Sequence, residues 1–193
     1  MPSTRYINRE ISWLEFNQRV LGEAQNPQLP VLERLKFLSI TGANLDEFFQ
    51  VRVGGLESLL RSGSRTRDLA GFTPGQQLEM IRERASQMKL DQYKELKEIL
   101  IPELEKQQIF LSDPERLPLN IMAQFRKRFT DSIAPLLTPI ALSPDTPDPF
   151  IRSMQLHLIL QLSTNSESEK RLLILPVPEN IDRFISKVCS VTL

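Results

Sequence analysis

Apolar residues recur at helical spacing through the first part of the chain. One apolar stripe lies within residues 8–25, and Pro27 follows its end. A second stripe begins after Pro30 and runs towards Gly42. Spacings of three and four residues place side chains on one face of a helix. The sequence therefore predicts two amphipathic helices, the second of which should end near Gly42. Their apolar positions are Ile11, Leu14, Val20, Leu21 and Ala24, then Val31, Leu32, Leu35 and Leu38.

Asn44 is the predicted start of a third helix. It is followed three residues later by Glu47, a spacing that resembles a capping box with asparagine in place of serine or threonine. This pattern predicts a helix from Leu45 to about Arg61. Asn44 would be its N-cap, and Asp46 and Glu47 would lie in the first turn, where the helix dipole stabilises negative charge.

A longer helical pattern follows a polar and basic connection at residues 62–72. Thr73 and Pro74 are a favourable N-cap and first helical residue. The pattern continues to Gln108, although Pro102 should kink this helix or end it early. The predicted inward stripe comprises Leu78, Ile81, Ala85, Met88, Leu96, Leu100 and Leu104.

Two prolines interrupt the helical pattern within residues 111–119, and the pattern changes beyond them. Residues 120–134 still read as a helix. Leucine at every second position in residues 155–162, and a short apolar run at residues 171–177, predict two paired strands with a polar hairpin-type loop between them.

These elements predict the fold class and the division of the chain into domains. We expect an α-helical N-terminal domain, residues 1–110, followed by an incomplete mixed α/β domain, residues 111–193. A sheet that is cut short leaves an unpaired edge. We therefore expect residues beyond about Leu119 to be less well packed than the helices.

Composition narrows the possible environments and partners of the protein. Its 24 basic and 24 acidic residues balance, whereas nucleic-acid binders usually carry a basic surplus, so no nucleic-acid partner is expected. The single cysteine, Cys189, cannot form an internal disulfide and is expected to be a buried thiol. No apolar run approaches the ~20 residues of a transmembrane helix, and the first residues lack a signal-peptide core. We expect a cytoplasmic protein without a transmembrane segment.

No catalytic centre or metal site is visible in the sequence. A glycine-rich phosphate loop, a Cys/His metal spacing and a Gly-x-Ser-x-Gly elbow are all missing, so neither a catalytic residue nor a metal ligand is predicted. The only histidine, His157, falls in a predicted strand, where it should face solvent or a partner. Two basic groups could face a polyanion, although short charge runs are usually solvated: Arg61, Arg65 and Arg67, and residues 126–128.

Three stretches of the chain resemble the polyphosphate kinase family. They are residues 6–53, which include the run SITGANLDEFFQVRV, residues 135–151, PLLTPIALSPDTPDPFI, and residues 172–185, LLILPVPENIDRFI. The resemblance implies an enzyme that uses ATP and Mg²⁺ to lengthen inorganic polyphosphate reversibly through a phosphohistidine. It also implies a helical N-terminal domain followed by a mixed "head" domain that helps subunits form a homo-oligomer. His157 does not match the catalytic histidine, so this chain would be an inactive N-terminal fragment that ends before the catalytic domains.

Asn44 is the one binding residue that the resemblance implies. It matches the asparagine that contacts the nucleotide in the family, and its amide can donate and accept as an adenine edge requires. A simple N-cap remains the alternative for Asn44. For the whole chain, the alternative is a non-catalytic helical interaction or oligomerisation module, with the stripe from Leu78 to Leu104 as its surface.

Overall fold

The computed structural model describes residues 5–143, 149–163, 170–182 and 184–185. The chain divides into two compact units, Met1–Leu111 and Ser112–Leu193. The first unit is helical and the second combines helix with a small antiparallel sheet, as the fold class predicted. Among the described residues, no helix is both long enough and apolar enough to cross a bilayer.

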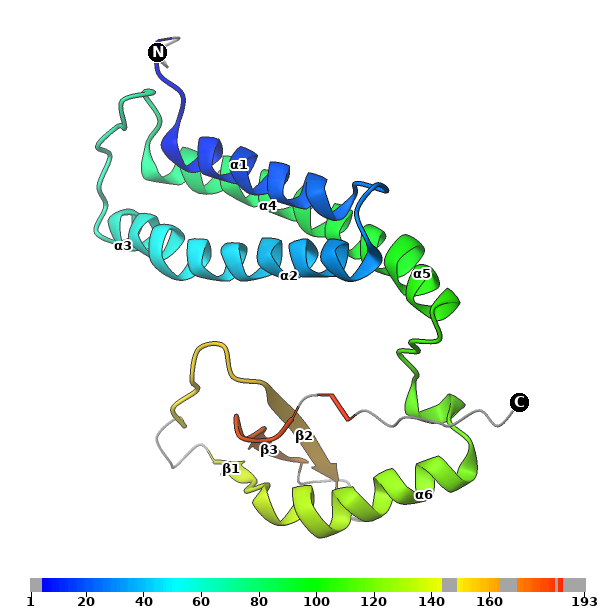
Figure 1. Ribbon diagram of the computed structural model, residues 1–193. Coiled ribbons are helices and arrows are strands. Elements are labelled where there is room, and N and C mark those ends of the chain that lie inside the picture. The colour runs from blue at the N-terminus through cyan, green and yellow to red at the C-terminus, as the bar shows by residue number, and fades with distance from the viewer. Residues whose placement is uncertain (1–4, 144–148, 164–169, 183, 186–193) are drawn as a thin grey trace. The chain divides into compact units, whose positions relative to one another are not determined.

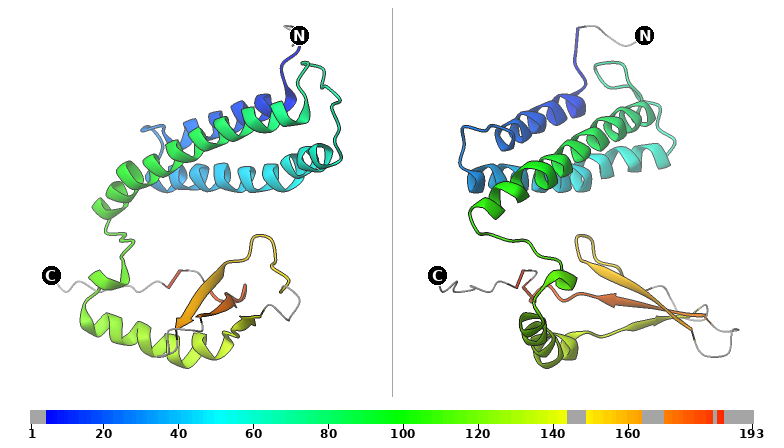
Figure 2. Two further views of the ribbon diagram at one scale, coloured as in Figure 1. Left: turned by 180° about the vertical axis from the view of Figure 1, so that it is seen from behind. Right: turned by 90° about the vertical axis from the view of Figure 1, so that its right-hand side faces the viewer.

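The helical unit is built around three long helices that pack side by side (Figures 1 and 2). Helix α1 packs against both α2 and α4, and the short α3 packs against α4. Two π-helical segments, Phe49–Val53 and Glu95–Leu100, join α2 to α3 and α4 to α5 without a break. The helices are α1 (Arg9–Ala24), α2 (Val31–Phe48), α3 (Gly54–Arg61), α4 (Pro74–Lys94) and α5 (Ile101–Lys106).

Local capping explains where α1 and α4 begin. The Asn8 side chain accepts hydrogen bonds from the backbone N–H groups of Glu10 and Ile11 at the start of α1. At the start of α4, Thr73 and Gln76 form a reciprocal capping box, and Pro74 is the first helical residue. The predicted N-cap at Thr73 is thus confirmed. Each cap satisfies backbone donors that a helix leaves unpaired at its N-terminus.

The predicted helix end near Gly42 and the predicted N-cap at Asn44 are both wrong. Helix α2 passes through both residues and continues to Phe48, so Asn44 lies in its interior. Leu38 and Phe48 are buried on either side of this region, and their burial outweighs the cost of about 1 kcal/mol for a glycine within a helix. Asp46 and Glu47 consequently lie in the last turn of α2, where the helix dipole does not stabilise them.

Pro102 does not end the long helix, which continues to Lys106. A proline in a helix lacks an N–H donor, and its ring clashes with the carbonyl four residues earlier, here Glu98. The π-helical segment Glu95–Leu100 contains that residue and widens the turn immediately before the proline. The prediction of an early end is wrong because the wider turn accommodates the proline without ending the helix.

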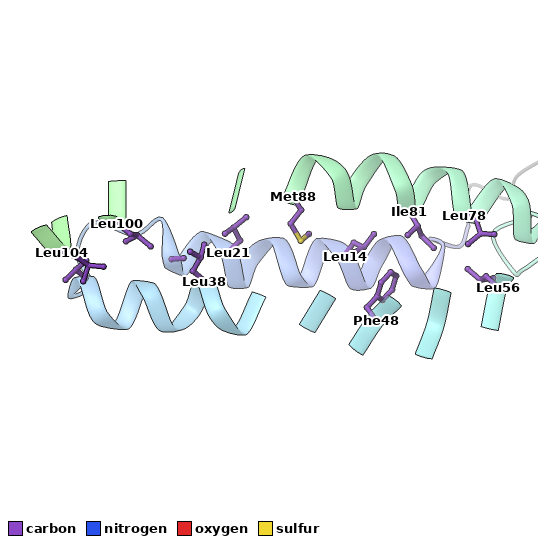
Figure 3. Packing of buried hydrophobic residues seen from close by; sticks show 12 residues of the cluster. Leu14, Leu21, Leu38, Phe48, Leu56, Leu78, Ile81, Met88, Leu100 and Leu104 are labelled. Atoms are coloured by element: carbon purple, nitrogen blue, oxygen red, sulfur yellow. The ribbon is translucent and has the colours of Figure 1, made fainter. Parts of the chain in front are cut away.

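The core of the helical unit is a continuous apolar cluster between α1, α2 and α4 (Figure 3). Leu14 and Leu21 of α1 and Phe48 of α2 are almost completely buried in it. The inward stripe predicted for the long helix is confirmed, with Leu96 half-buried and its other members buried: Leu78, Ile81, Ala85, Met88, Leu100 and Leu104. This stripe therefore cannot serve as the docking surface of an interaction module.

Arg34 ties four segments of the helical unit together. Its guanidinium donates to the carbonyl of Ala24 at the end of α1, at 2.9 Å. It also pairs with Glu95 of the π-helical segment and Glu103 of α5, both at 2.7 Å. The Arg34 and Glu95 side chains are only 4% and 10% exposed, so this ion pair is shielded from water.

A second ion pair joins α1 to α4 nearer the surface. The Arg84 guanidinium donates two hydrogen bonds to the Glu15 carboxylate. These bonds favour the charged carboxylate and lower the pKa of Glu15 below its usual range. Because the Glu15 side chain is half exposed, the pair fixes the helix register more than it adds to stability.

The second unit places a helix beside a three-stranded antiparallel sheet (Figure 1). Helix α6 (Leu119–Arg128) continues through a π-helical turn, Phe129–Ile133, and a 3₁₀ turn, Ala134–Leu136; another 3₁₀ turn, Pro114–Arg116, precedes it. The strands are β1 (Ile140–Leu142), β2 (His157–Ser163) and β3 (Lys170–Pro176), in the order β1-β3-β2.

The predicted pairing of two strands is confirmed, with His157 opposite Pro176 and Leu162 opposite Arg171. Strand β1 was not predicted, because three residues are too few to show an alternating pattern. The predicted polar loop between β2 and β3 falls mostly outside the described residues, and Cys189 lies outside them entirely.

Apolar packing in the second unit is sparse. Ile174 and Leu175 of β3 are the buried apolar residues among those described there. Leu158 and Leu160 of β2 are 44% and 38% exposed, and β2 forms one edge of the sheet in the described part of the chain. The expectation that residues beyond about Leu119 are less well packed than the helices is confirmed for this part.

Candidate functional site

Asn44 lies in the interior of α2 and forms a side-chain pair with Asn17 of α1. The Asn44 Nδ2 donates to Asn17 Oδ1 at 2.9 Å. Asn44 is half-buried, whereas Asn17 is completely buried. No hydrogen bond from the described residues reaches the Asn44 Oδ1. This pair is the candidate site because one amide is anchored in the core and the other reaches the surface.

Asn17 is held firmly by groups from two other helices. Its Nδ2 donates to the backbone carbonyl of Thr41 in α2 at 3.1 Å and contacts the Sδ of Met88 in α4 at 3.4 Å. Thr41 is itself buried, and its hydroxyl donates to the carbonyl of Phe37. Buried polar groups that are fully bonded give a region one well-defined arrangement. The candidate site therefore has a rigid base.

Aromatic residues adjoin the two asparagines one helical turn along each helix. Trp13, four residues before Asn17, stacks on Phe48, four residues after Asn44, with ring centroids 4.6 Å apart. Residues four apart share a helix face, so the Trp13–Phe48 ring pair and the Asn17–Asn44 amide pair are neighbouring contacts between α1 and α2. The Arg52 guanidinium lies 5.6 Å from the Trp13 ring centroid, a cation–π arrangement.

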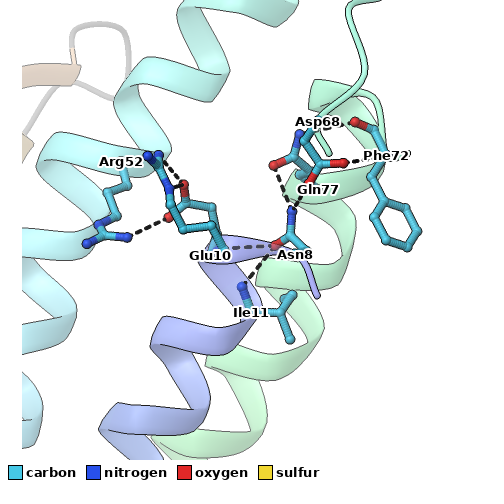
Figure 4. A network of polar contacts seen from close by, with 8 residues as sticks. Asn8, Glu10, Ile11, Arg52, Asp68, Phe72 and Gln77 are labelled. Atoms are coloured by element: carbon cyan, nitrogen blue, oxygen red, sulfur yellow. Dashed lines mark hydrogen bonds and ion pairs between the residues drawn. The ribbon is translucent and has the colours of Figure 1, made fainter. Parts of the chain in front are cut away.

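Glu10 and Arg52 secure the π-helical segment against α1 (Figure 4). The Glu10 carboxylate is 5% exposed and accepts from Arg52 at 3.1 Å and from Arg9 at 2.6 Å. A π-helical turn shifts the register of the residues that follow, and such turns often occur at functional sites. Here the shifted residue Arg52 reaches both Glu10 and Trp13.

A second polar network joins Asn8, at the N-terminus of α1, to α4 and to the connection that precedes it (Figure 4). The Asn8 Nδ2 donates to Asp68 at 2.6 Å and to Gln77 at 2.9 Å. Asp68 in turn accepts from the backbone N–H of Phe72. These contacts anchor the polar connection between α3 and α4, so the network has a structural role.

The basic residues singled out in the sequence form two groups, one in each unit. Arg61, Arg65 and Arg67 are all exposed, and Arg67 donates to the carbonyl of Gly71 within its own connection. On α6, Lys127 pairs with Asp131 and the adjoining Arg128 with Asp182. A role of the three arginines in binding a polyanion remains a prediction.

His157 is half-buried in β2, and its Nδ1 lies 2.9 Å from the carbonyl of Gln155. Together with Phe150 and Arg152 it lines a cavity beside the sheet.

The acidic pair Asp46 and Glu47 is exposed. Nowhere in the described ranges do three or more acidic, histidine or cysteine residues come together in a group that could hold a metal ion.

Sequence reasoning singled out Asn44 but missed its partner. Asn17 occupies a position between Leu14 and Leu21 on the apolar stripe of α1, and all three are buried. A polar residue at an inward position of an amphipathic helix is the signal that could have found it, because buried amides need hydrogen-bond partners. Trp13, Glu10 and Arg52 carried no comparable signal. Arg52 reaches Glu10 and Trp13 from the π-helical segment, and Trp13 stacks on Phe48, a residue far away in the sequence.

Comparison with known proteins extends the resemblance over almost the whole chain. The polyphosphate kinase N-terminal domain matches residues 6–112, and the polyphosphate kinase middle domain matches residues 122–189. The polyphosphate kinase of Thermosynechococcus vestitus is 38% identical over 181 residues, which are 94% of this chain and 25% of that protein. That of Mycolicibacterium gilvum is 37% identical over 185 residues, or 96% of this chain and 25% of the relative.

A solved structure agrees with these matches. The crystal structure of polyphosphate kinase from Porphyromonas gingivalis superposes with a TM-score of 0.77 and 32% sequence identity, covering 92% of this chain and 25% of that one. The chain thus spans about a quarter of the length of the relatives it matches. Since the N-terminal domain alone matches more than half of the residues, the chain belongs to the polyphosphate kinase family.

Proposed function

We propose that this chain is the N-terminal portion of a polyphosphate kinase and supplies one wall of its ATP pocket. The complete enzyme would transfer the terminal phosphate of ATP to inorganic polyphosphate, reversibly and through a phosphohistidine, with Mg²⁺ as cofactor. Histidine suits such a step because its ring nitrogen forms covalent intermediates. In this proposal His157 is not that nucleophile, because it does not match the catalytic histidine of the family; its Nδ1 lies 2.9 Å from the carbonyl of Gln155.

Asn44 carries this proposal. It lies within residues 6–112, which match the N-terminal domain, and its amide is anchored on one side only. One Nδ2 hydrogen and the Oδ1 are left for a ligand after the bond to Asn17. A side-chain amide presents a donor and an acceptor side by side, which is the pattern that pairs with an adenine edge.

Binding at Asn44 does not depend on a helix N-terminus. Asn44 lies in the interior of α2, so free backbone N–H groups and a positive dipole end are not available there. The amide and the neighbouring apolar surface would act instead. Phe16, next to Asn17, and Ile40, one turn before Asn44, are 47% and 39% exposed and could flank a flat base.

Substituting Asn44→Ala should weaken binding of ATP to the purified chain about tenfold, the effect expected for loss of a paired donor and acceptor on the base. Isothermal calorimetry with ATP and Mg²⁺ would measure the dissociation constant of both proteins. Turnover with polyphosphate is expected from neither of them.

The matched control is Gln92→Ala. Gln92 is another half-buried amide between helices, and its Nε2 donates to the carbonyl of Leu38 at 3.2 Å. This substitution should leave ATP binding unchanged. Absence of binding at millimolar ATP, or equal weakening in both variants, would refute the proposed role of Asn44.

A further inference from the structure

The Asn17 amide has a single orientation that satisfies its surroundings. Its Nδ2 faces two acceptors, the Thr41 carbonyl and the Met88 sulfur, at 3.1 and 3.4 Å. A rotated amide would place Oδ1 against the carbonyl oxygen, and two acceptors cannot bond to each other. Asn17 is completely buried, so water cannot compensate such a rotation. The hydrogen-bond partners therefore fix which atom is nitrogen.

The fixed orientation of the Asn17 amide also determines the orientation of the Asn44 amide. The Asn17 Oδ1 can only accept, so the atom of Asn44 that lies 2.9 Å from it must be the donor Nδ2. A rotated Asn44 amide would bring two oxygens together beside the core. The bond to Asn17 thus leaves the Oδ1 and one N–H of Asn44 for other partners, with the two atoms in a defined order.

We propose that Asn17 is a positioning residue that gives the nucleotide site its preference for adenine, by fixing the Asn44 amide. This rests on the proposed contact between Asn44 and the base. Adenine carries an exocyclic amino donor, whereas hypoxanthine carries a carbonyl acceptor at the same place. An amide held with its oxygen towards that group accepts from adenine and repels hypoxanthine. A freely rotating amide could turn its N–H to the hypoxanthine carbonyl and would lose the distinction.

Comparing ATP with inosine triphosphate tests this proposal, because the two ligands differ only in the base edge. The unmodified chain should bind ATP about tenfold more tightly than inosine triphosphate, as one well-oriented amide allows. Asn17→Leu keeps the branched shape of the side chain but removes the acceptor that orients Asn44. This substitution should bring the ratio of the two dissociation constants to within about twofold of unity.

Gln92→Leu is the matched control, since it also replaces an amide between helices with leucine but does not touch Asn44. Its ratio should equal that of the unmodified chain. Emission of Trp13, the only tryptophan, would show that each variant keeps the packing of α1 against α2.

Two results would overturn the role of Asn17. One is equal binding of ATP and inosine triphosphate by the unmodified chain, which needs no variant to fold. The other is an Asn17→Leu variant that weakens both ligands by the same factor, as a purely structural defect would. If Asn44→Ala still weakens ATP binding in either case, the proposed function stands and only the inference about Asn17 fails.

Discussion

Replacing Arg34 with methionine should lower the free energy of unfolding of the helical unit by about 3–5 kcal/mol, the cost of leaving one partner of a buried ion pair alone. Glu95 would lose its partner in a nearly water-free position, and the Ala24 carbonyl would lose its donor. Denaturant unfolding followed by Trp13 fluorescence would measure this change. Because Trp13 lies in α1, the signal reports on the helical unit alone.

Two further variants separate this effect from general damage. In the double variant Arg34→Met and Glu95→Leu, most of the lost stability should return, because apolar residues often replace a buried ion pair without cost. Arg82→Met removes an exposed arginine paired with Glu79 and should change stability by less than about 1 kcal/mol. If Arg34→Met alone lowered the free energy of unfolding by less than about 1 kcal/mol, the contacts of Arg34 would not be a main source of stability in the helical unit.

Phe48→Ala should destabilise the helical unit by about 3–5 kcal/mol, the range for truncating a large buried aromatic side chain. Phe48 is 1% exposed in the core and stacks on Trp13. The cavity would also loosen the surroundings of Trp13, so its emission in the folded state should shift to longer wavelength. Unfolding curves and emission spectra of the same samples would check both effects.

The adjoining residue supplies the control for this prediction. Phe49 is 42% exposed, and its ring and that of Phe48 are T-shaped to each other, with centroids 5.8 Å apart. Phe49→Ala should therefore cost less than about 1.5 kcal/mol and leave the emission of Trp13 unchanged. Equal losses of stability from the two substitutions would contradict a specific contribution of the Trp13–Phe48 ring stack to the packing of α1 against α2.

Local signals in the sequence were sufficient to place most helix starts and two of the strands. A cap such as Thr73 and a helix-compatible proline such as Pro74 act within a few residues, so their effect can be read directly from the chain. The alternation of leucine in β2 likewise reflects the two faces of one strand. Such elements are predictable because their causes are local.

The register of α2 could not be predicted because its cause is not local. Asn44 and Glu47 have the spacing of a helix start, yet burial of Leu38 and Phe48 on one face keeps the helix continuous. The Asn44 side chain instead forms a hydrogen bond with Asn17, 27 residues away, and no spacing in the sequence predicts that partner. The same holds for the two π-helical segments, which arise where packing requires a shifted register.

The sequence singled out Asn44 but did not predict its structural surroundings. The resemblance implied a nucleotide contact through the Asn44 amide, while the residue spacing predicted that Asn44 is a helix N-cap. In the structure, the side chain occupies a helix interior and gains its orientation from the buried Asn17. The structure removes the N-cap role of Asn44, and the contact between its amide and an adenine edge remains a proposal.

Nuclear magnetic resonance of the side-chain amides in the ¹⁵N-labelled chain tests the contact between Asn44 and ATP most directly. The side-chain NH₂ signals of Asn44 should move saturably as ATP and Mg²⁺ are added, while those of Gln92 stay in place. A folded chain whose Asn44 signals do not move at millimolar ATP would contradict the assignment of this residue to the nucleotide pocket.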